Sequence, residues 1–593
     1  MRNLLFFLIL LWTLSSFGQS EALGKNYFER GDYEKALTIF KKLARQNPHR
    51  TDYTEYLLKS HQQLENFEEA ETIIRKKLNG KRPVPRYYVE LGHNYAIQEK
   101  DSLAEVSYQK AIKGVEENPF SAYAVGRAFT DYSLLDQAAS TYELAMRLDP
   151  ERDYNPQLAR IYGEQGKLDK MFEKYIDLIH SNSAYRATAQ RNFSYYVNED
   201  PNNEANVILR KTLLKKLQQG PNIIYNELLS WLFIQQKDFT KAFIQEKAIY
   251  KRSEEDLRGI VDLLRIAMDE ADYDAAREVV AFVIEKAPRQ EIRLEGYQYR
   301  MDIELQLAEK KDYPEIEAQY LQLLEEFGVG KNTLALQLDF NQFQAFQNGK
   351  KEAAISNLKE LLNNPLSIYQ EARVKLKLAD ILVFDEKFNQ ALIYYSQVQK
   401  KVKNDVLAQE ARFKVAQTSY FKGDFEWAQI QLDVLKKSAS QLIANDAMQL
   451  SLMIRDNSLE DSTQTALKKF ARADLLTLQQ KNTEAISALQ EILTNHKGEK
   501  IEDEALLKLG AIYEELKEYE LARDHYQKLI DFYKEDILAD DAYFKLAKLY
   551  EGPLAQVEKA KELYEQIIFN FADSIYFVEA RKRYRMLRGD AIN

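Results

Sequence analysis

Four alanines recur at one fixed spacing, and this feature constrains the fold more than any other. Ala36, Ala70, Ala104 and Ala138 follow one another at intervals of 34 residues. Aromatic and small residues surround each of them in the same order. A fixed period of this length is typical of stacked supersecondary units. The sequence therefore predicts an array of repeats and not a single globular core.

The residues of the first repeat predict a helical hairpin. Gly24 and Ala36 are small where two helices approach closely, and Phe40 fills the space beside them. Gly31 supplies a permissive backbone for the turn between the helices, and Pro48 marks the end of the second helix. One hairpin cannot bury its apolar face alone, so its neighbours must stack on it. We expect an all-α fold, a curved α-solenoid or superhelix of stacked hairpins.

The repeated residues also indicate a family. The first repeat carries a Gly, a Tyr, an Ala, an aromatic residue and a closing Pro, namely Gly24, Tyr27, Ala36, Phe40 and Pro48. The third repeat carries much of this pattern, with Gly92, Tyr95, Ala104 and Tyr108. The fourth repeat does so with Gly126, Phe129, Ala138, Tyr142 and Pro150. This pattern resembles the tetratricopeptide repeat. The resemblance implies helical hairpins that bind other proteins. In such solenoids the first helix of each hairpin lines the concave surface.

Similar anchor residues continue along the chain with a changing interval: Met171, Ala242, Ala276, Ile316, Ala354, Ala391, Ala428, Ala485, Ala522 and Ala560. The repeat is clearest at both ends. We therefore predict a signal peptide over 1–18, an N-terminal array over 19–180, a divergent middle over 181–330 and a C-terminal array over 331–593. Residues 183–220 are expected to form a divergent hairpin, and 441–466 keep no readable repeat.

The first residues resemble a secretory signal. Arg2 precedes an apolar run over 4–14, and Ser16 and Gly18 are small residues at the two positions that cleavage requires. The expected mature protein starts near Gln19, in a bacterial periplasm, with no transmembrane segment after cleavage. An uncleaved N-terminal anchor is the alternative. The chain has no cysteine, which excludes disulfides and a lipid-bearing cysteine.

No motif of catalysis or cofactor binding is found. The 6 histidines are dispersed, and no HExxH pair or GxSxG elbow occurs. Residues 328–332 share two glycines and a lysine with a phosphate-binding loop, but Asn332 replaces the Ser or Thr that would hold magnesium. We interpret them as a turn between helices. Acidic pairs such as Glu68–Glu69 and Asp540–Asp541 are expected to be solvated. The sequence predicts no enzyme, no cofactor and no metal site.

One basic position recurs on the helices that would line the groove. The first and third repeats carry a Leu-Gly pair on their first helix, and in the first five repeats the residue that follows this position is Lys25, Lys59, His93, Arg127 and Arg160 in turn. These basic residues recur although the chain as a whole has a net charge of −10. We expect this basic ladder, with the aromatic residues Phe120 and Tyr123, to receive an acidic partner segment through charge-assisted hydrogen bonds. Glu21 and Glu55 precede the first two lysines by four residues and would neutralise them. No acid stands four residues before the other three members of the ladder.

These observations predict a non-enzymatic protein-interaction scaffold of the cell envelope. In the C-terminal half the intervals of 37 and 38 residues resemble repeats of bacterial envelope proteins, which implies partners among envelope or outer-membrane assembly components. The net negative charge of the chain argues against nucleic-acid binding. Two alternatives stay open: an enzyme or accessory subunit with a site in the divergent middle, near residues 191–231, and a membrane-anchored envelope-assembly organiser.

Overall fold

The computed structural model describes residues 20–80, 83–253, 255–438, 441–458 and 464–590. The predicted signal peptide, residues 1–18, lies outside these ranges. The described residues form helices and turns and contain no strand. They fall into two compact units, and the second begins at Leu257. The domain boundaries predicted after residues 180 and 330 stay predictions.

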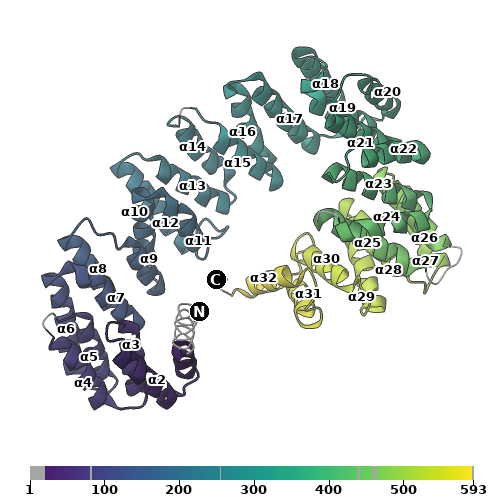
Figure 1. The fold of residues 1–593 in the computed structure, drawn as a ribbon. Helices are drawn as coiled ribbons and strands as arrows, with labels where there is room; N and C mark the ends of the chain where they lie inside the picture. Colours follow the sequence, from purple (N-terminus) through teal and green to yellow (C-terminus); the bar gives the residue numbers. More distant parts are fainter. Residues whose placement is uncertain (1–19, 81–82, 254, 439–440, 459–463, 591–593) are drawn as a thin grey trace, which may run out of the picture. The chain divides into compact units, whose positions relative to one another are not determined.

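The first unit consists of helices that pair as antiparallel hairpins, each lying beside the next along the chain (Figure 1). Residues 20–29 form its first described helix. The others are α2 (Tyr33–Gln46), α3 (Thr51–Gln63), α4 (Phe67–Leu78), α5 (Arg86–Ala96), α6 (Asp101–Glu117), η1 (Pro119–Ser121), α7 (Ala122–Asp131), α8 (Leu135–Leu148), α9 (Asn155–Glu164), α10 (Leu168–Ser181), η2 (Ser183–Tyr185), α11 (Arg186–Phe193), α12 (Glu204–Gln219), α13 (Ile223–Gln235) and α14 (Phe239–Tyr250).

The second unit continues the same plan. Its helices are α15 (Arg258–Asp269), α16 (Tyr273–Lys286), α17 (Gln290–Leu307), η3 (Lys310–Asp312), α18 (Tyr313–Phe327), η4 (Lys331–Thr333), α19 (Leu334–Phe346), α20 (Lys351–Leu361), α21 (Ile368–Phe384), α22 (Phe388–Lys401), α23 (Val406–Lys422), α24 (Phe425–Ser438), α25 (Gln441–Ser458), α26 (Thr465–Leu478), α27 (Asn482–Asn495), α28 (Ile501–Glu515), α29 (Tyr519–Tyr533), α30 (Ala539–Glu551), α31 (Val557–Asn570) and α32 (Phe577–Arg588). In each unit the hairpins stack, which confirms the predicted all-α solenoid.

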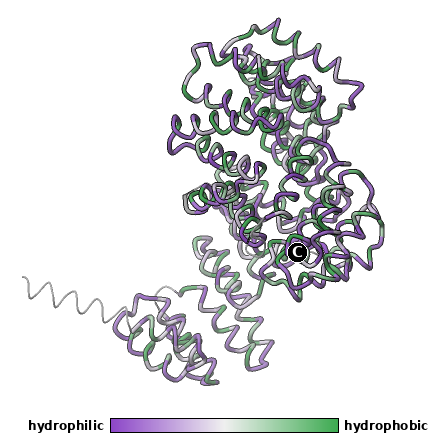
Figure 2. Tube along the Cα trace, turned by 90° about the vertical axis from the view of Figure 1, so that its right-hand side faces the viewer, coloured by the Kyte–Doolittle hydropathy of each residue, from purple (hydrophilic) through white to green (hydrophobic). Residues whose placement is uncertain are grey.

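Each hairpin is held by small residues that face large ones. Hydrophobic and hydrophilic residues are interspersed along the helices in the hydropathy-coloured trace (Figure 2). The anchor alanines, such as Ala36, are fully buried. A Cβ added to Gly126 would lie 2.4 Å from Cζ of Tyr142, and one added to Gly510 would lie 2.2 Å from Cε1 of Tyr526. The glycines thus let an aromatic ring of the second helix reach the backbone of the first, as the sequence predicts.

The turn inside a hairpin repeats one backbone conformation. Gly31, Glu65, Glu99 and Ser133 all have positive φ, between 58° and 81°, and lie 34 residues apart. Side chains disfavour this region because Cβ approaches the following carbonyl oxygen. Gly31 was expected at such a turn. The other three positions show that the fold imposes the conformation on ordinary residues as well.

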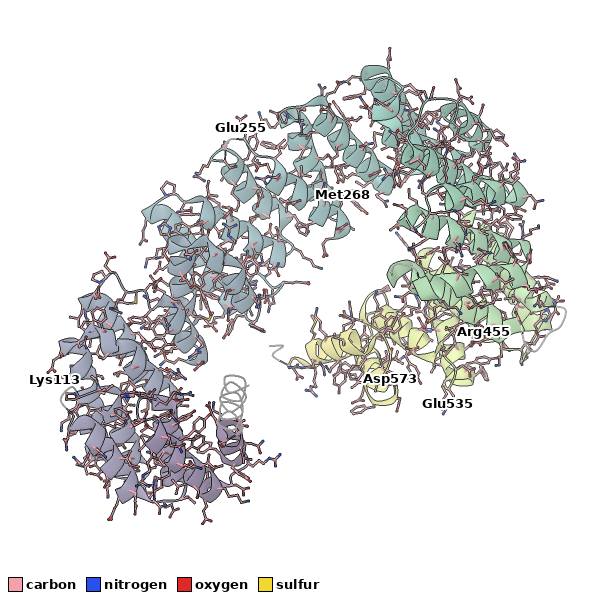
Figure 3. All side chains as sticks on the ribbon, viewed as in Figure 1. Lys113, Glu255, Met268, Arg455, Glu535 and Asp573 are labelled. Atoms are coloured by element: carbon pink, nitrogen blue, oxygen red, sulfur yellow. The ribbon has the colours of Figure 1, made fainter. Side chains whose placement is uncertain are left out.

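The stretch over 441–466, which keeps no readable repeat, contains an additional helix. α25 packs against α24, and α26 packs on α23 as the next repeat would. The Tyr420 hydroxyl of α23 donates to Asp474 of α26 at 2.7 Å. Arg455 of α25, labelled in Figure 3, lies 3.8 Å from Asp433 of α24. The insertion of α25 explains why the interval from Ala428 to Ala485 is 57 residues, whereas the interval from Ala391 to Ala428 is 37 residues.

One further interpretation of the sequence is confirmed, and another is not. Residues 328–332 belong to the connection between α18 and α19, with Gly328 at φ 79°, and not to the mouth of a strand that a phosphate loop would require. Residues 183–220 contain a short α11 and the longer α12, but these two helices do not pair as the predicted hairpin, because both pack against α10 and α12 also packs against α13. No helix in the described part of the chain has the length and apolarity that a bilayer crossing needs.

Candidate functional site

The first two residues of the predicted basic ladder are held in ion pairs. Nζ of Lys25 lies 2.8 Å from Glu21, and Nζ of Lys59 lies 2.9 Å from Glu55. Both acids precede their lysine by four residues on the same helix, as the sequence indicated. These pairs lower the pKa of Glu21, through the hydrogen bond from Lys25, and keep its charge in place. The two lysines therefore offer a partner little unpaired charge.

The third residue, His93, is not a cation at neutral pH. Its ring stacks on Tyr132 with 3.7 Å between the ring centroids. Burial, followed by the charge of Lys59, lowers the pKa of His93 to about 4. The expectation of a basic residue at this position is therefore wrong, because desolvation disfavours the charged imidazole.

A buried network that the sequence analysis missed surrounds this histidine. The Arg86 guanidinium of α5 donates to Glu55 of α3 at 3.2 Å and to Glu90 of α5 at 3.0 Å. The hydroxyl of Tyr132, the residue directly after α7, also donates to Glu90. The Glu90 side chain is 2% exposed, so its charge depends on these two partners. The sequence signal for this network is an acid that recurs at intervals of 34 and 35 residues, at Glu21, Glu55 and Glu90.

Arg127 and Arg160 remain accessible. Their side chains are 65% and 64% exposed. Each has an acid four residues later on its own helix: Nε of Arg127 lies 4.0 Å from Asp131, and Nε of Arg160 lies 3.6 Å from Glu164. Both acids follow their arginine, whereas Glu21 and Glu55 precede their lysines. Exposed pairs at these distances contribute little, so both guanidinium groups can bind another acceptor.

The two aromatic residues predicted beside them, Tyr123 and Phe120, are both exposed, but they contact different parts of the fold. Tyr123 of α7 is 51% exposed, and its backbone carbonyl accepts the Tyr142 hydroxyl at 3.5 Å. Tyr123 stands four residues before Arg127 on α7, so these two side chains lie on the same face of that helix. Phe120 is 73% exposed and has the Arg152 guanidinium 3.7 Å above its ring. Phe120 thus lies by the connection between α8 and α9.

The region around residues 191–231 contains aromatic packing. The Trp231 ring lies 6.1 Å from the fully buried ring of Phe193. His180 approaches Asn222 at 3.1 Å and Tyr225 at 3.3 Å. Within the described ranges, no three or more His, Cys, Asp or Glu side chains are placed to hold a metal ion.

Several acids are less solvated than the sequence suggests. Glu68 and Glu69 are exposed as expected. Asp541 is not fully solvated: it accepts the Tyr576 hydroxyl at 2.8 Å, and burial raises its pKa. Asp339, which is half-buried in the second unit, also has a pKa that burial raises.

Comparisons with known proteins give matches at both ends of the chain. Models of the tetratricopeptide repeat match residues 21–80, 504–536 and 541–574. No curated protein gives a significant match. Two similar solved structures are the "Structure of Naa15/Naa10 bound to HypK-THB", at 12% identity over 96% of each chain with a TM-score of 0.29, and the "Crystal structure of APC/C hetero-tetramer Cut9-Hcn1", at 13% identity over 95% of each chain with a TM-score of 0.22. The segments at the two ends of the chain are thus similar to tetratricopeptide repeats.

Proposed function

We propose that the protein is a non-enzymatic interaction scaffold that binds an acidic, extended segment of a protein partner on its first unit. One observation carries the proposal: Arg127 and Arg160, on the first helices of successive hairpins, keep about two thirds of their side-chain surface exposed. Tyr123 adds an accessible aromatic ring beside them. Guanidinium groups bind carboxylates through strong, directional hydrogen bonds.

The first two members of the ladder have a supporting role. Glu21 and Glu55 engage Lys25 and Lys59, and Arg86, which lies outside the ladder, pairs with Glu55 and Glu90. These pairs fix the surface that precedes Arg127 and Arg160. A partner carboxylate would have to displace these internal acids. Binding is therefore concentrated at Arg127 and Arg160 and not spread evenly over five residues.

The test uses the full chain and a fluorescein-labelled peptide rich in Asp and Glu. The variant Arg127→Glu with Arg160→Glu should weaken binding, measured by fluorescence anisotropy, by a factor of about 10 or more, which corresponds to about 1.4 kcal/mol. The matched control is Arg45→Glu with Arg147→Glu, two exposed arginines on the second helices of their hairpins. Equal affinity of the two double variants would contradict the proposed surface.

We also propose export to a bacterial periplasm and partners in envelope or outer-membrane assembly. The basic start, apolar run and small residues of positions 2–18 support export. N-terminal sequencing of the protein purified from its native cells tests this. A start near Gln19 supports a cleaved signal, whereas an intact Met1 supports the membrane-anchored organiser instead.

A further inference from the structure

The outer face of α32, the last described helix, exposes apolar side chains. α32 packs on α31, with Ala580 fully buried and Tyr584 and Leu587 against the same core. The other side of the helix carries Val578 and Met586, which are 69% and 56% exposed. The end helix of a stacked array usually has a polar outer face, because no further repeat covers it. Apolar side chains on this face are therefore typical of a surface that another molecule covers.

Two cations lie beside these apolar side chains. Arg581 and Lys582 are exposed, and neither has an acid at ion-pair distance within the described ranges. Lys582 follows Val578 by four residues and precedes Met586 by four, so these three side chains form one line along the helix. We call Val578, Arg581, Lys582 and Met586 the end surface. It combines apolar contact area with positive charge.

The acids near the end surface are paired or lie outside the helix. Glu579, the one acid within α32, lies 2.8 Å from Nε of Arg583. Asp590, which follows the helix, accepts a hydrogen bond from Nε of Arg588 at 2.8 Å. Asp573, labelled in Figure 3, is exposed in the connection that precedes α32. The two cations of the end surface are therefore available to another molecule.

Other first helices show that a further hairpin of this array would not fit on the end surface. Lys582 stands two residues after the buried Ala580. The same position in three other first helices is apolar and packs against a core: Phe413 of α23, Leu507 of α28 and Phe544 of α30. The ring of Phe544 stacks on Tyr576, directly before α32, with 4.3 Å between the ring centroids. A hairpin packed in this way on α32 would bury the Lys582 ammonium group without a counter-charge, which is costly.

We propose that the end surface binds an amphipathic helix of a protein partner. Apolar side chains of that helix would contact Val578 and Met586, and its Asp or Glu side chains would pair with Arg581 and Lys582. An amphipathic helix that lays its apolar face on a hydrophobic surface is a common recognition mode. A second copy of the chain, meeting through the same surface, would oppose cation to cation. Charge complementarity therefore favours an acidic partner helix.

This inference rests on the proposed scaffold function and names a second surface, in the other unit. Its test starts from the full chain with Arg127→Glu and Arg160→Glu, which removes the surface proposed on the first unit. The probe is a fluorescein-labelled helical peptide with leucines along one face and glutamates along both flanks. Adding Arg581→Glu with Lys582→Glu should weaken binding about 10-fold or more by fluorescence anisotropy.

Further variants separate the apolar contribution from the charge. In the same starting chain, Val578→Ser with Met586→Ser should weaken binding about 10-fold, because apolar contact area is lost. The matched control is Lys41→Glu with Lys42→Glu, two adjacent exposed cations of α2, which should leave the affinity unchanged. The same peptide with lysine in place of every glutamate should not bind.

Position-specific crosslinking locates the bound peptide. Benzoylphenylalanine in place of Met586 should attach the peptide under light, whereas the same group in place of Leu521, 40% exposed on α29, should not. Unchanged affinity in both double variants of the end surface would overturn the proposal. Binding of phosphatidylglycerol vesicles through Arg581 and Lys582, without binding of the peptide, would also overturn it. Capture of an extended acidic peptide by the wild-type first unit would show that the scaffold function still stands.

Discussion

Gly92 of α5 and Tyr108 of α6 touch so closely that no side chain fits between them: an added Cβ would lie 2.3 Å from Cε1 and 2.5 Å from Cδ1 of the tyrosine. Tyr108 is itself only 5% exposed. The contact joins the two helices of one hairpin. The same relationship recurs between Gly126 and Tyr142 and between Gly510 and Tyr526, at both ends of the chain.

Gly92→Ala should therefore destabilise the first unit by about 1–3 kcal/mol, the usual cost of overpacking. Chemical denaturation measures the change. Tyr108→Leu should make room for the methyl group, so the double variant should lose less stability than the sum of the two single variants. Gly220→Ala is the control, since nothing lies within 4 Å of its added Cβ. Equal effects at positions 92 and 220 would contradict the packing argument.

The positive φ of the hairpin turns predicts that a glycine introduced there stabilises the fold. Ala271, between α15 and α16, has φ 58°. Ala271→Gly should stabilise the second unit by about 0.5–1 kcal/mol, because glycine removes the cost of the left-handed conformation. Ala353→Gly, at an exposed site inside α20, should instead cost about 0.5–1 kcal/mol. Thermal unfolding measures both, and a loss of stability in Ala271→Gly would refute the explanation.

The buried pair of Arg86 and Glu90 should be sensitive to removal of one partner. Arg86→Met leaves the Glu90 carboxylate, 2% exposed, with the Tyr132 hydroxyl alone. We expect a loss of about 3–5 kcal/mol in unfolding free energy. Adding Glu90→Gln should restore part of it by removing the unpaired charge. Lys35→Met breaks an exposed pair with Asp32 and should cost less than about 1 kcal/mol. Similar losses in the two single variants would argue against a buried charge.

His93 should make the first unit sensitive to acid. Its pKa is lowered to about 4 by burial, whereas the unfolded histidine has a pKa near 6.5. Between these values the unfolded state binds more protons, so stability is present above pH 6.5 and is lost as pH falls towards 4. His93→Phe keeps the stacking on Tyr132 and should reduce the fall in stability between pH 7 and pH 5 by about 1–2 kcal/mol. An unchanged pH dependence would mean that folding does not lower the pKa of His93.

The fold could be predicted from the sequence because each hairpin uses the same small and aromatic residues. Ala36 and Gly24 carry that information locally, and so does Gly31. α25 could not be predicted, since its residues follow no repeat. The candidate site was only partly predictable. The type and spacing of Arg127 and Arg160 were visible, but the neutrality of His93 depends on its burial between helices.

The most direct test of the scaffold function is photo-crosslinking in the native cells, with benzoylphenylalanine in place of Tyr123 and, as a control, of Val106. Both positions are about half exposed, on α7 and α6. We predict that specific proteins are captured at position 123 and not at 106, and that Arg127→Glu with Arg160→Glu abolishes this capture. Equal capture at both positions, or capture that survives the charge reversal, would contradict the proposed binding surface.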